Sequence, residues 1–267
     1  MENVVTEGSV TASTEQAGGI AAYNAGIIRN VFNSASVSAN TRVGGIVGEN
    51  IGLVESAVNY GGFTVSSYGG GIVGVNGDAG SVLNSVNLGE AETFGGTSSV
   101  VGGVAGSNAG LISDVYNAAA INVTGERIGS VVGYLLNAKQ GSGRVYNLSS
   151  ASSRNVVGFS EITVPETFTA LSLYAFLSGE AIFSENGLVR PAFEEGKGYL
   201  HAPSFAEKEG FKDYFERSLF AAGDGSEASP YVINDEQNWN LFAVNSALFS
   251  YEGKFVRLNV SLDLGEI

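Results

Sequence analysis

The single histidine of the chain, His201, limits the chemistry that its 267 residues could perform. A Ser-His-Asp triad needs a histidine held between the nucleophile and a carboxylate, and a histidine-rich metal site needs several such residues. His201 has no companion, so we interpret it as a structural or exposed residue. The chain has no cysteine, which excludes disulfide bonds and thiolate chemistry. We therefore expect no catalytic residue and no cofactor.

Carboxylates are the remaining candidates for catalysis. A β-helix that cleaves polysaccharides would need carboxylates gathered on one face over adjacent turns. Glu49 and Glu55 share one repeat unit, and three further acids flank the next, but none recurs in register. A carbohydrate-active enzyme is therefore kept only as an alternative, with its site near residues 90–99 or in the C-terminal part.

Four loop acids could also be considered as calcium ligands, because calcium prefers oxygen ligands in loops. They are Asp78, Glu90, Glu92 and Asp224. The chain lacks the GGxGxDxUx pattern of calcium-binding β-helices. We interpret these acids as solvated loop residues and assign no metal site.

Exposed aromatic side chains are better candidates for binding. Aromatic faces can stack on sugars or on the side chains of a partner protein. The candidates are expected at or near corners of the fold, where packing is least demanding, and they are Tyr23, Tyr60, Phe63, Tyr68 and Phe94. The alternative for each residue is ordinary packing in the core or in a turn.

The net charge of −14 restricts the classes of partner. Nucleic-acid binding needs clustered lysine and arginine, and the 13 basic residues here are scattered. An anionic membrane surface would repel such a chain. No run of 18 apolar residues is present, so we expect no membrane insertion by this segment.

A repeat must position all of these side chains. GGIVG begins at Gly44 and at Gly70, and near-copies begin at Gly18, Gly102 and Gly129, at intervals of 26, 26, 32 and 27 residues. Self-similarity at such a period is typical of a solenoid. The chain starts in the middle of a unit, so we expect it to be a piece of a longer polypeptide.

Each unit contains three short apolar stretches separated by glycine and asparagine, which predicts three strands. The second unit, for example, reads GGIVG, GLVESAV and GFTVSSY. Helical pairs are disfavoured, because glycine costs about 1 kcal/mol per helix position. The predicted fold is all-β, a three-sided, right-handed parallel β-helix of about five to six turns with a smaller mixed C-terminal part. The predicted domains are residues 1–200 and 201–267.

Equivalent positions of successive units carry similar residues. Three apolar columns contain Ile46, Val54 and Val58, and these should stack as ladders about 4.8 Å apart. Two asparagine columns begin at Asn24 and Asn33, where we expect corners and hydrogen bonds between turns. The fifth unit has Ser130 in place of the second glycine, which indicates that the stack is ending.

The pattern GG-[IV]-[VA]-G-x-N-x-G-x-[IV]-x-[NS]-x-x-N resembles the GLUG repeat of large bacterial surface proteins and of some immunoglobulin-A-cleaving proteases. The resemblance covers residues 3–148. It implies an extracellular or cell-surface β-helical module and does not imply a reaction.

The repeat fades after residue 148. The segment 181–193 is similar to the strands that close such β-helices, and residues 206–219 predict a short amphipathic helix. Residues 223–264 resemble the opening of a second β-helical module, with Asn234 as the expected N-cap of a helix and Gln237 as its capping-box partner.

These observations predict a structural or adhesive segment of a bacterial surface or secreted protein, without catalysis. Its partners would be glycans or proteins of a host or a neighbouring cell, together with neighbouring modules of the same polypeptide. A non-catalytic accessory module of a secreted protease is a further alternative.

Overall fold

The computed structural model describes residues 1–13, 15–94, 98–148, 154–171, 193–194, 197–198, 220–235, 238–239, 242 and 251–261. The chain divides into two compact units, Met1–Leu188 and Val189–Ile267. The predicted division was at residue 200. The predicted helix at 206–219, the closing segment 181–193 apart from Phe193, and His201 lie outside the described residues.

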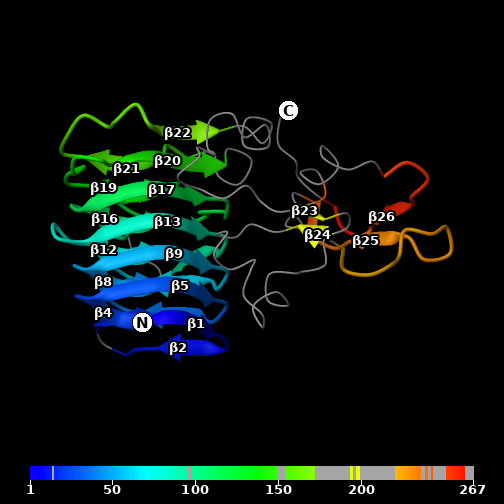
Figure 1. Cartoon of the computed structure of the whole chain (residues 1–267), viewed down its shortest axis with the longest axis horizontal. Helices are drawn as coiled ribbons and strands as arrows, with labels where there is room; N and C mark the ends of the chain where they lie inside the picture. Colours follow the sequence, from blue (N-terminus) through cyan, green and yellow to red (C-terminus); the bar gives the residue numbers. More distant parts are fainter. Residues whose placement is uncertain are drawn as a thin grey trace. The chain divides into compact units, whose positions relative to one another are not determined.

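The first unit is a coil of parallel strands in four sheets (Figure 1). Sheet A contains β1 (Glu2–Thr6), β5 (Ile27–Asn33), β9 (Leu53–Asn59), β13 (Ser81–Asn87), β17 (Leu111–Asn117), β20 (Gly143–Leu148) and β22 (Phe168–Leu171). Sheet B contains β2 (Ser9–Thr11), β6 (Ser36–Ala39), β10 (Phe63–Val65) and β14 (Ala91–Thr93). Sheet C contains β3 (Gln16–Gly18), β7 (Arg42–Gly44), β11 (Tyr68–Gly70), β15 (Val100–Gly102) and β18 (Arg127–Gly129). Sheet D contains β4 (Ala21–Asn24), β8 (Val47–Asn50), β12 (Val73–Asn76), β16 (Ala105–Asn108), β19 (Val132–Leu135) and β21 (Val157–Ser160).

The predicted fold class is confirmed, because strands one turn apart pair in parallel and in register to form a β-helix. Two details differ from the prediction. The longest sheet has seven strands, so the coil has about seven turns. The first turns contribute one strand to each of four sheets where three strands per turn were expected. The extra strand arises at the glycine pair, since β7 ends at Gly44 and β8 begins only at Val47.

Two apolar cores run along the coil. The first is lined by sheets A and D and includes the predicted columns of Ile46 and Val54. The second is lined by sheets B and C and includes Val37, Val43 and Phe63. Burying each such side chain contributes about 1.5–3 kcal/mol. A single turn could not bury these side chains alone, so the stacking of turns stabilises the coil. The predicted column that contains Val58 is also buried, but it belongs to neither core cluster.

Both asparagine columns form the predicted ladders. The Nδ2 atom of each residue donates to the Oδ1 atom of the next at 2.8–3.2 Å, along Asn24, Asn50, Asn76 and Asn108, and along Asn33, Asn59, Asn87, Asn117 and Asn147. Asn87 also donates to the Gly89 carbonyl at 2.9 Å and accepts from the Gly89 N–H at 3.1 Å. Its two donors and two acceptor sites are therefore all used, which permits complete burial of the amide.

The second ladder lies directly against the second glycine of each glycine pair. A Cβ atom added to Gly71 would lie 2.0 Å from Asn87 Cγ, and one added to Gly45 would lie 2.3 Å from Asn59 Cγ. Real Cβ atoms do not approach other heavy atoms so closely, so only glycine fits. We call this contact between the asparagine ladder and the glycine column the waist of the coil. It explains why GG and N recur together in every full repeat.

The stack does not end at the fifth unit, as Ser130 had suggested. Ser130 is fully buried, and its hydroxyl donates to the Asn155 carbonyl at 3.2 Å. The coil continues through β21 and β22, which pair with β19 and β20. A serine therefore occupies the position of the second glycine in this turn.

Sheet A carries a bend that the motif position [NS] encodes. One residue in each of six of its strands has a left-handed backbone, with φ between 48° and 60°, at Asn3, Asn30, Ser56, Asn84, Asp114 and Arg144. Asparagine and aspartate tolerate this conformation better than most residues. Arg144 does not share that tolerance, but its guanidinium forms an ion pair with Asp114 of the preceding turn.

Arg154 covers carbonyl groups beside the second core. Its Nε atom donates to the Ile121 carbonyl at 2.8 Å, and its Nη2 atom donates to the Val123 carbonyl. We expect Arg154→Leu to lower the free energy of unfolding by about 1–3 kcal/mol, because both carbonyls lose a charged donor. Denaturant unfolding would measure the change. Arg29→Leu, which removes a half-buried surface ion pair with Glu55, is the matched control and should cost less than about 1 kcal/mol. Equal losses in the two variants would contradict this role of Arg154.

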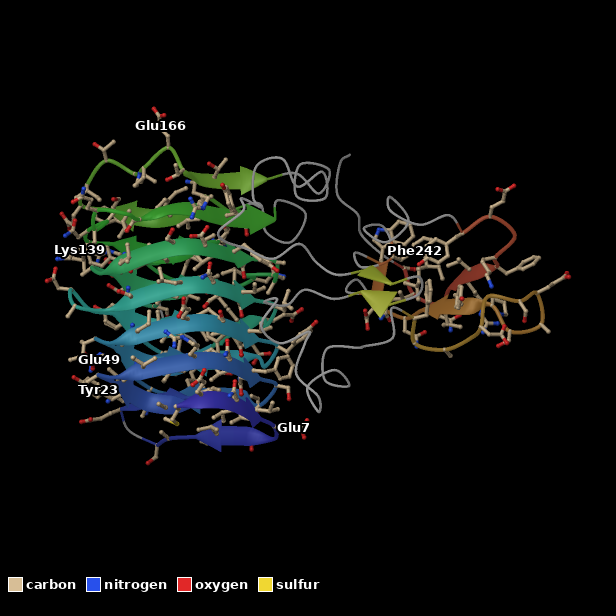
Figure 2. The ribbon with its side chains drawn as sticks, viewed as in Figure 1. Glu7, Tyr23, Glu49, Lys139, Glu166 and Phe242 are labelled. Atoms are coloured by element: carbon tan, nitrogen blue, oxygen red, sulfur yellow. The ribbon has the colours of Figure 1, made fainter. Side chains whose placement is uncertain are left out.

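The second unit contains β25 (Tyr231–Ile233) and β26 (Val256–Leu258), which pair in parallel, and the short pair β23 (Phe193–Glu194) and β24 (Lys197–Gly198). Phe220 and Ile233 are buried beside Tyr231, Trp239, Phe242 and Tyr251 (Figure 2). The Asn238 N–H donates to Asp235 Oδ1 at 2.6 Å, so the N-cap is Asp235 and not the predicted Asn234. The described part of the chain contains no helix that is long and apolar enough to span a membrane.

Candidate functional site

The structure separates the five aromatic candidates. Phe94 and Tyr23 are exposed, with 57% and 48% of their surface accessible. Tyr68 is half-buried, and so is Tyr60, whose ring centre lies 5.4 Å from that of Phe32. The expectation that Phe63 is exposed is wrong, since it is 1% accessible. Its side chain points into the second core, in register with Val37 and Ala91 on the neighbouring turns.

Tyr23 and Tyr68 belong to one surface. They belong to two parallel columns of residues along sheets C and D, which we call the C/D strip. The sheet C column is Gln16, Arg42, Tyr68, Val100 and Arg127. The sheet D column is Tyr23, Glu49, Val75, Ser107, Tyr134 and Phe159. Figure 2 shows Tyr23 and Glu49 on the same edge of the coil, on neighbouring turns. Tyr60 and Phe94 follow strands of sheets A and B and do not join the strip.

Contacts across the strip hold its two columns together. Arg42 Nη1 lies 3.0 Å from Glu49 Oε2. At the equivalent position three turns later, the Arg127 guanidinium lies over the Tyr134 ring, 4.2 Å from its centre. The two residues of each pair are seven positions apart in the sequence, which is a signal for this pairing. The signal can be interpreted only once each unit is known to contain a corner between sheets C and D.

The last two turns of the strip form an aromatic cluster that sequence reasoning missed. The ring centres of Tyr134 and Phe159 are 5.6 Å apart, and Arg127 also lies 5.0 Å from the Phe159 ring centre. The Tyr134 hydroxyl donates to Glu161 Oε1 at 2.5 Å, and Arg127 Nη2 lies 3.2 Å from Glu126 Oε1. Each of these long side chains therefore has a partner that fixes its orientation. A surface ordered in advance loses less entropy when it binds a ligand.

The hydrogen bond to Glu161 raises the pKa of Tyr134, and removal from water and the charge of Glu161 act in the same direction. The folded state thus keeps its phenol protonated to higher pH than the unfolded state. The associated stability is fully present below pH 10 and is lost as the pH rises through the folded-state value. We expect Glu161→Gln to lower the pKa of Tyr134, measured by ultraviolet titration of the tyrosines. An unchanged titration curve would show that the bond does not form.

Four of the candidate acids have separate partners, and these are Glu49, Glu55, Asp78 and Asp224. Glu49 is paired with Arg42, and Glu55 lies 2.7 Å from Arg29 Nε. Asp78 lies 2.6 Å from Lys139 Nζ. Hydrogen bonds from the Ser226 side chain and from its backbone N–H lower the pKa of Asp224. Within the described part of the chain, no three acidic or histidine side chains gather in a way that could hold a metal ion.

Comparisons with known proteins add no relative from which a role could be transferred. No family model matches the chain, no curated protein matches it, and no solved structure matches it.

Proposed function

We propose that this chain is a structural and adhesive module of a bacterial cell-surface or secreted protein, which presents the C/D strip to a partner and catalyses nothing. The observation that carries the proposal is the in-register strip, whose side chains are exposed or half-buried on every turn except the one that carries the buried Val100 and Ser107. Its aromatic and arginine members are the residue types that contribute most to binding at protein surfaces.

The interior of the coil favours a structural role. The cores are apolar, and the buried asparagines of the two ladders use their amides to join one turn to the next. Side chains engaged in this way are not available for a reaction, but they hold the turns in register. The GLUG resemblance of the repeat and the compartment that it implies belong to the same proposal.

Two other functions remain alternatives of lower rank. A carbohydrate-active enzyme would need carboxylates within reach of one bond, whereas Glu49 and Glu55 are each paired with arginine. An accessory module of a secreted protease would be consistent with the same coil, and its catalytic domain would lie elsewhere in the polypeptide.

The proposal is tested by applying the full chain to arrays of printed glycans and of extracellular proteins. We expect at least one ligand to be retained. We expect the variant Tyr23→Ser/Tyr68→Ser/Tyr134→Ser to lose that ligand, and Phe94→Ser, an exposed aromatic outside the strip, to keep it. Retention of no ligand would favour a plain spacer. Loss in Phe94→Ser alone would place the binding surface elsewhere.

A further inference from the structure

In the described part of the chain, sheet D ends in a strand with a free edge. β21 is the last strand of this sheet and pairs only with β19 among the described residues. Gly158 in β21 is exposed, although the equivalent residues Gly48, Gly74, Gly106 and Gly133 of the earlier turns are all buried. Phe159 is 46% accessible, whereas Ser107 in the same column is 3% accessible. Each earlier strand of sheet D is followed by a successor, and no described residue pairs with β21 in that way.

Apolar side chains gather around this edge. Leu136 follows β19, and Ile162 and Val164 follow β21. All three are large apolar residues with more than a third of their surface exposed. The Glu161 N–H donates to the Leu135 carbonyl at 2.9 Å, so the segments that carry Leu136 and Ile162 lie side by side. Together with Phe159 they form an apolar rim beside a strand that has one described neighbour, a combination typical of an edge that accepts a partner strand.

We propose that β21 binds an extended segment of a partner protein, which adds to sheet D as a further parallel strand. This inference rests on the proposed binding role and names the class of partner. The added strand would continue the hydrogen-bonding ladder of β19 and β21, and it would place an aromatic or β-branched side chain beside Phe159. Its backbone provides affinity, and its side chains provide specificity.

The coil also dictates one residue of the partner strand. A Cβ atom on Gly74 would lie 2.6 Å from the Gly48 carbonyl oxygen, one on Gly133 would lie 2.7 Å from that of Gly106, and one on Gly158 would lie 2.7 Å from that of Gly133. A strand that stacks on β21 in the same way meets the Gly158 carbonyl at this position. It must therefore carry glycine there, directly after the residue that stacks on Val157.

This requirement disfavours a second copy of the chain as the occupant. The free edge at the other end of sheet D is β4, whose residue at the glycine position is Ala22. Stacking β4 on β21 would bring the Ala22 Cβ atom against the Gly158 carbonyl. A head-to-tail stack of copies is thus blocked at the position where the turns of one chain fit closely.

The test uses the full chain and two synthetic peptides in fluorescence anisotropy. The first peptide copies residues 130–137, SVVGYLLN, which contain β19. The second has alanine in place of the glycine that corresponds to Gly133. We expect the first peptide to bind and the second to bind at least about tenfold more weakly. We expect Phe159→Ser in the protein to weaken binding of the first peptide by about tenfold or more, because truncation of a central aromatic contact typically costs more than 1 kcal/mol. Phe94→Ser is the control and should bind as the wild type does.

Thermal melts of both protein variants establish that a loss of binding is not a loss of fold. Equal affinity for the two peptides, or no binding of the first peptide, would overturn the inference. If the peptides fail while an array ligand is still retained through the strip, the inference is wrong and the proposed function stands. If a glycan is bound and Phe159→Ser abolishes that binding, the partner class is wrong. A rise in mass of the protein alone with concentration, abolished by Phe159→Ser, would identify a second copy as the occupant.

Discussion

Gly71→Ala should lower the free energy of unfolding by about 3 kcal/mol or more, the largest effect that we expect from adding one methyl group to this coil. The added Cβ atom would lie 2.0 Å from Asn87 Cγ and 2.3 Å from the Gly103 carbonyl oxygen. The backbone of the next turn cannot move without breaking its own ladder, and the asparagine is held by its neighbours above and below. Overpacking of this kind typically costs 1–3 kcal/mol, and more when the surroundings cannot yield. Denaturant unfolding followed by circular dichroism would measure the loss.

The matched control for this substitution is Gly62→Ala. The nearest atom to a Cβ on Gly62 is the Glu90 carbonyl oxygen at 3.5 Å, an ordinary contact distance. The free energy of unfolding should therefore change by less than about 1 kcal/mol, with a slight gain expected from reduced freedom of the unfolded chain. Equal stability of the two variants would show that the waist is looser than described.

The second large effect is expected for Asn87→Ala. This substitution leaves the Asn59 Nδ2 donor, the Asn117 Oδ1 acceptor and both backbone groups of Gly89 without their partner inside the coil. A buried polar group that loses its partner costs about 1–3 kcal/mol, so the total loss should be at least about 3 kcal/mol. Denaturant unfolding measures the change, and hydrogen exchange should show faster exchange at the corners of the turns that contain Asn59 and Asn117.

Asn40→Ala is the control for the ladder. Asn40 is exposed and donates one bond from its side chain, to the Ser13 carbonyl at 3.0 Å. Its removal should cost less than about 1 kcal/mol. A comparable loss in the two variants would contradict the special role of the buried ladder.

The sequence was sufficient to predict the fold class, two core columns and both asparagine ladders. These features repeat at a fixed interval, and residues at equivalent positions stack when each turn has the same path. The number of strands per turn was not predictable in the same way. GGIVG reads as one apolar run, and the corner inside it becomes visible only through the contact between Gly45 and Asn59.

The candidate surface was predicted only in part. Tyr23 and Tyr68 were identified as aromatic residues near corners, but Phe63 has the same local sequence character and is buried, because residue type alone does not give the direction of a side chain within a three-residue strand. The cluster of Arg127, Tyr134 and Phe159 lies where the repeat has already weakened, so no recurring pattern marked it. Its members are brought together by the register of β18, β19 and β21.

Native mass spectrometry measures ligand binding and any chemical change of the ligand in one experiment, so it tests directly whether the chain binds without turnover. The full chain is incubated with a panel of oligosaccharides and of extended peptides that contain a valine-glycine-tyrosine segment. The proposed function predicts complexes in which the ligand keeps its original mass, and it predicts their loss in a variant that combines Tyr68→Ser, Tyr134→Ser and Phe159→Ser. Shortened or otherwise altered ligands, or the absence of any complex, would contradict it.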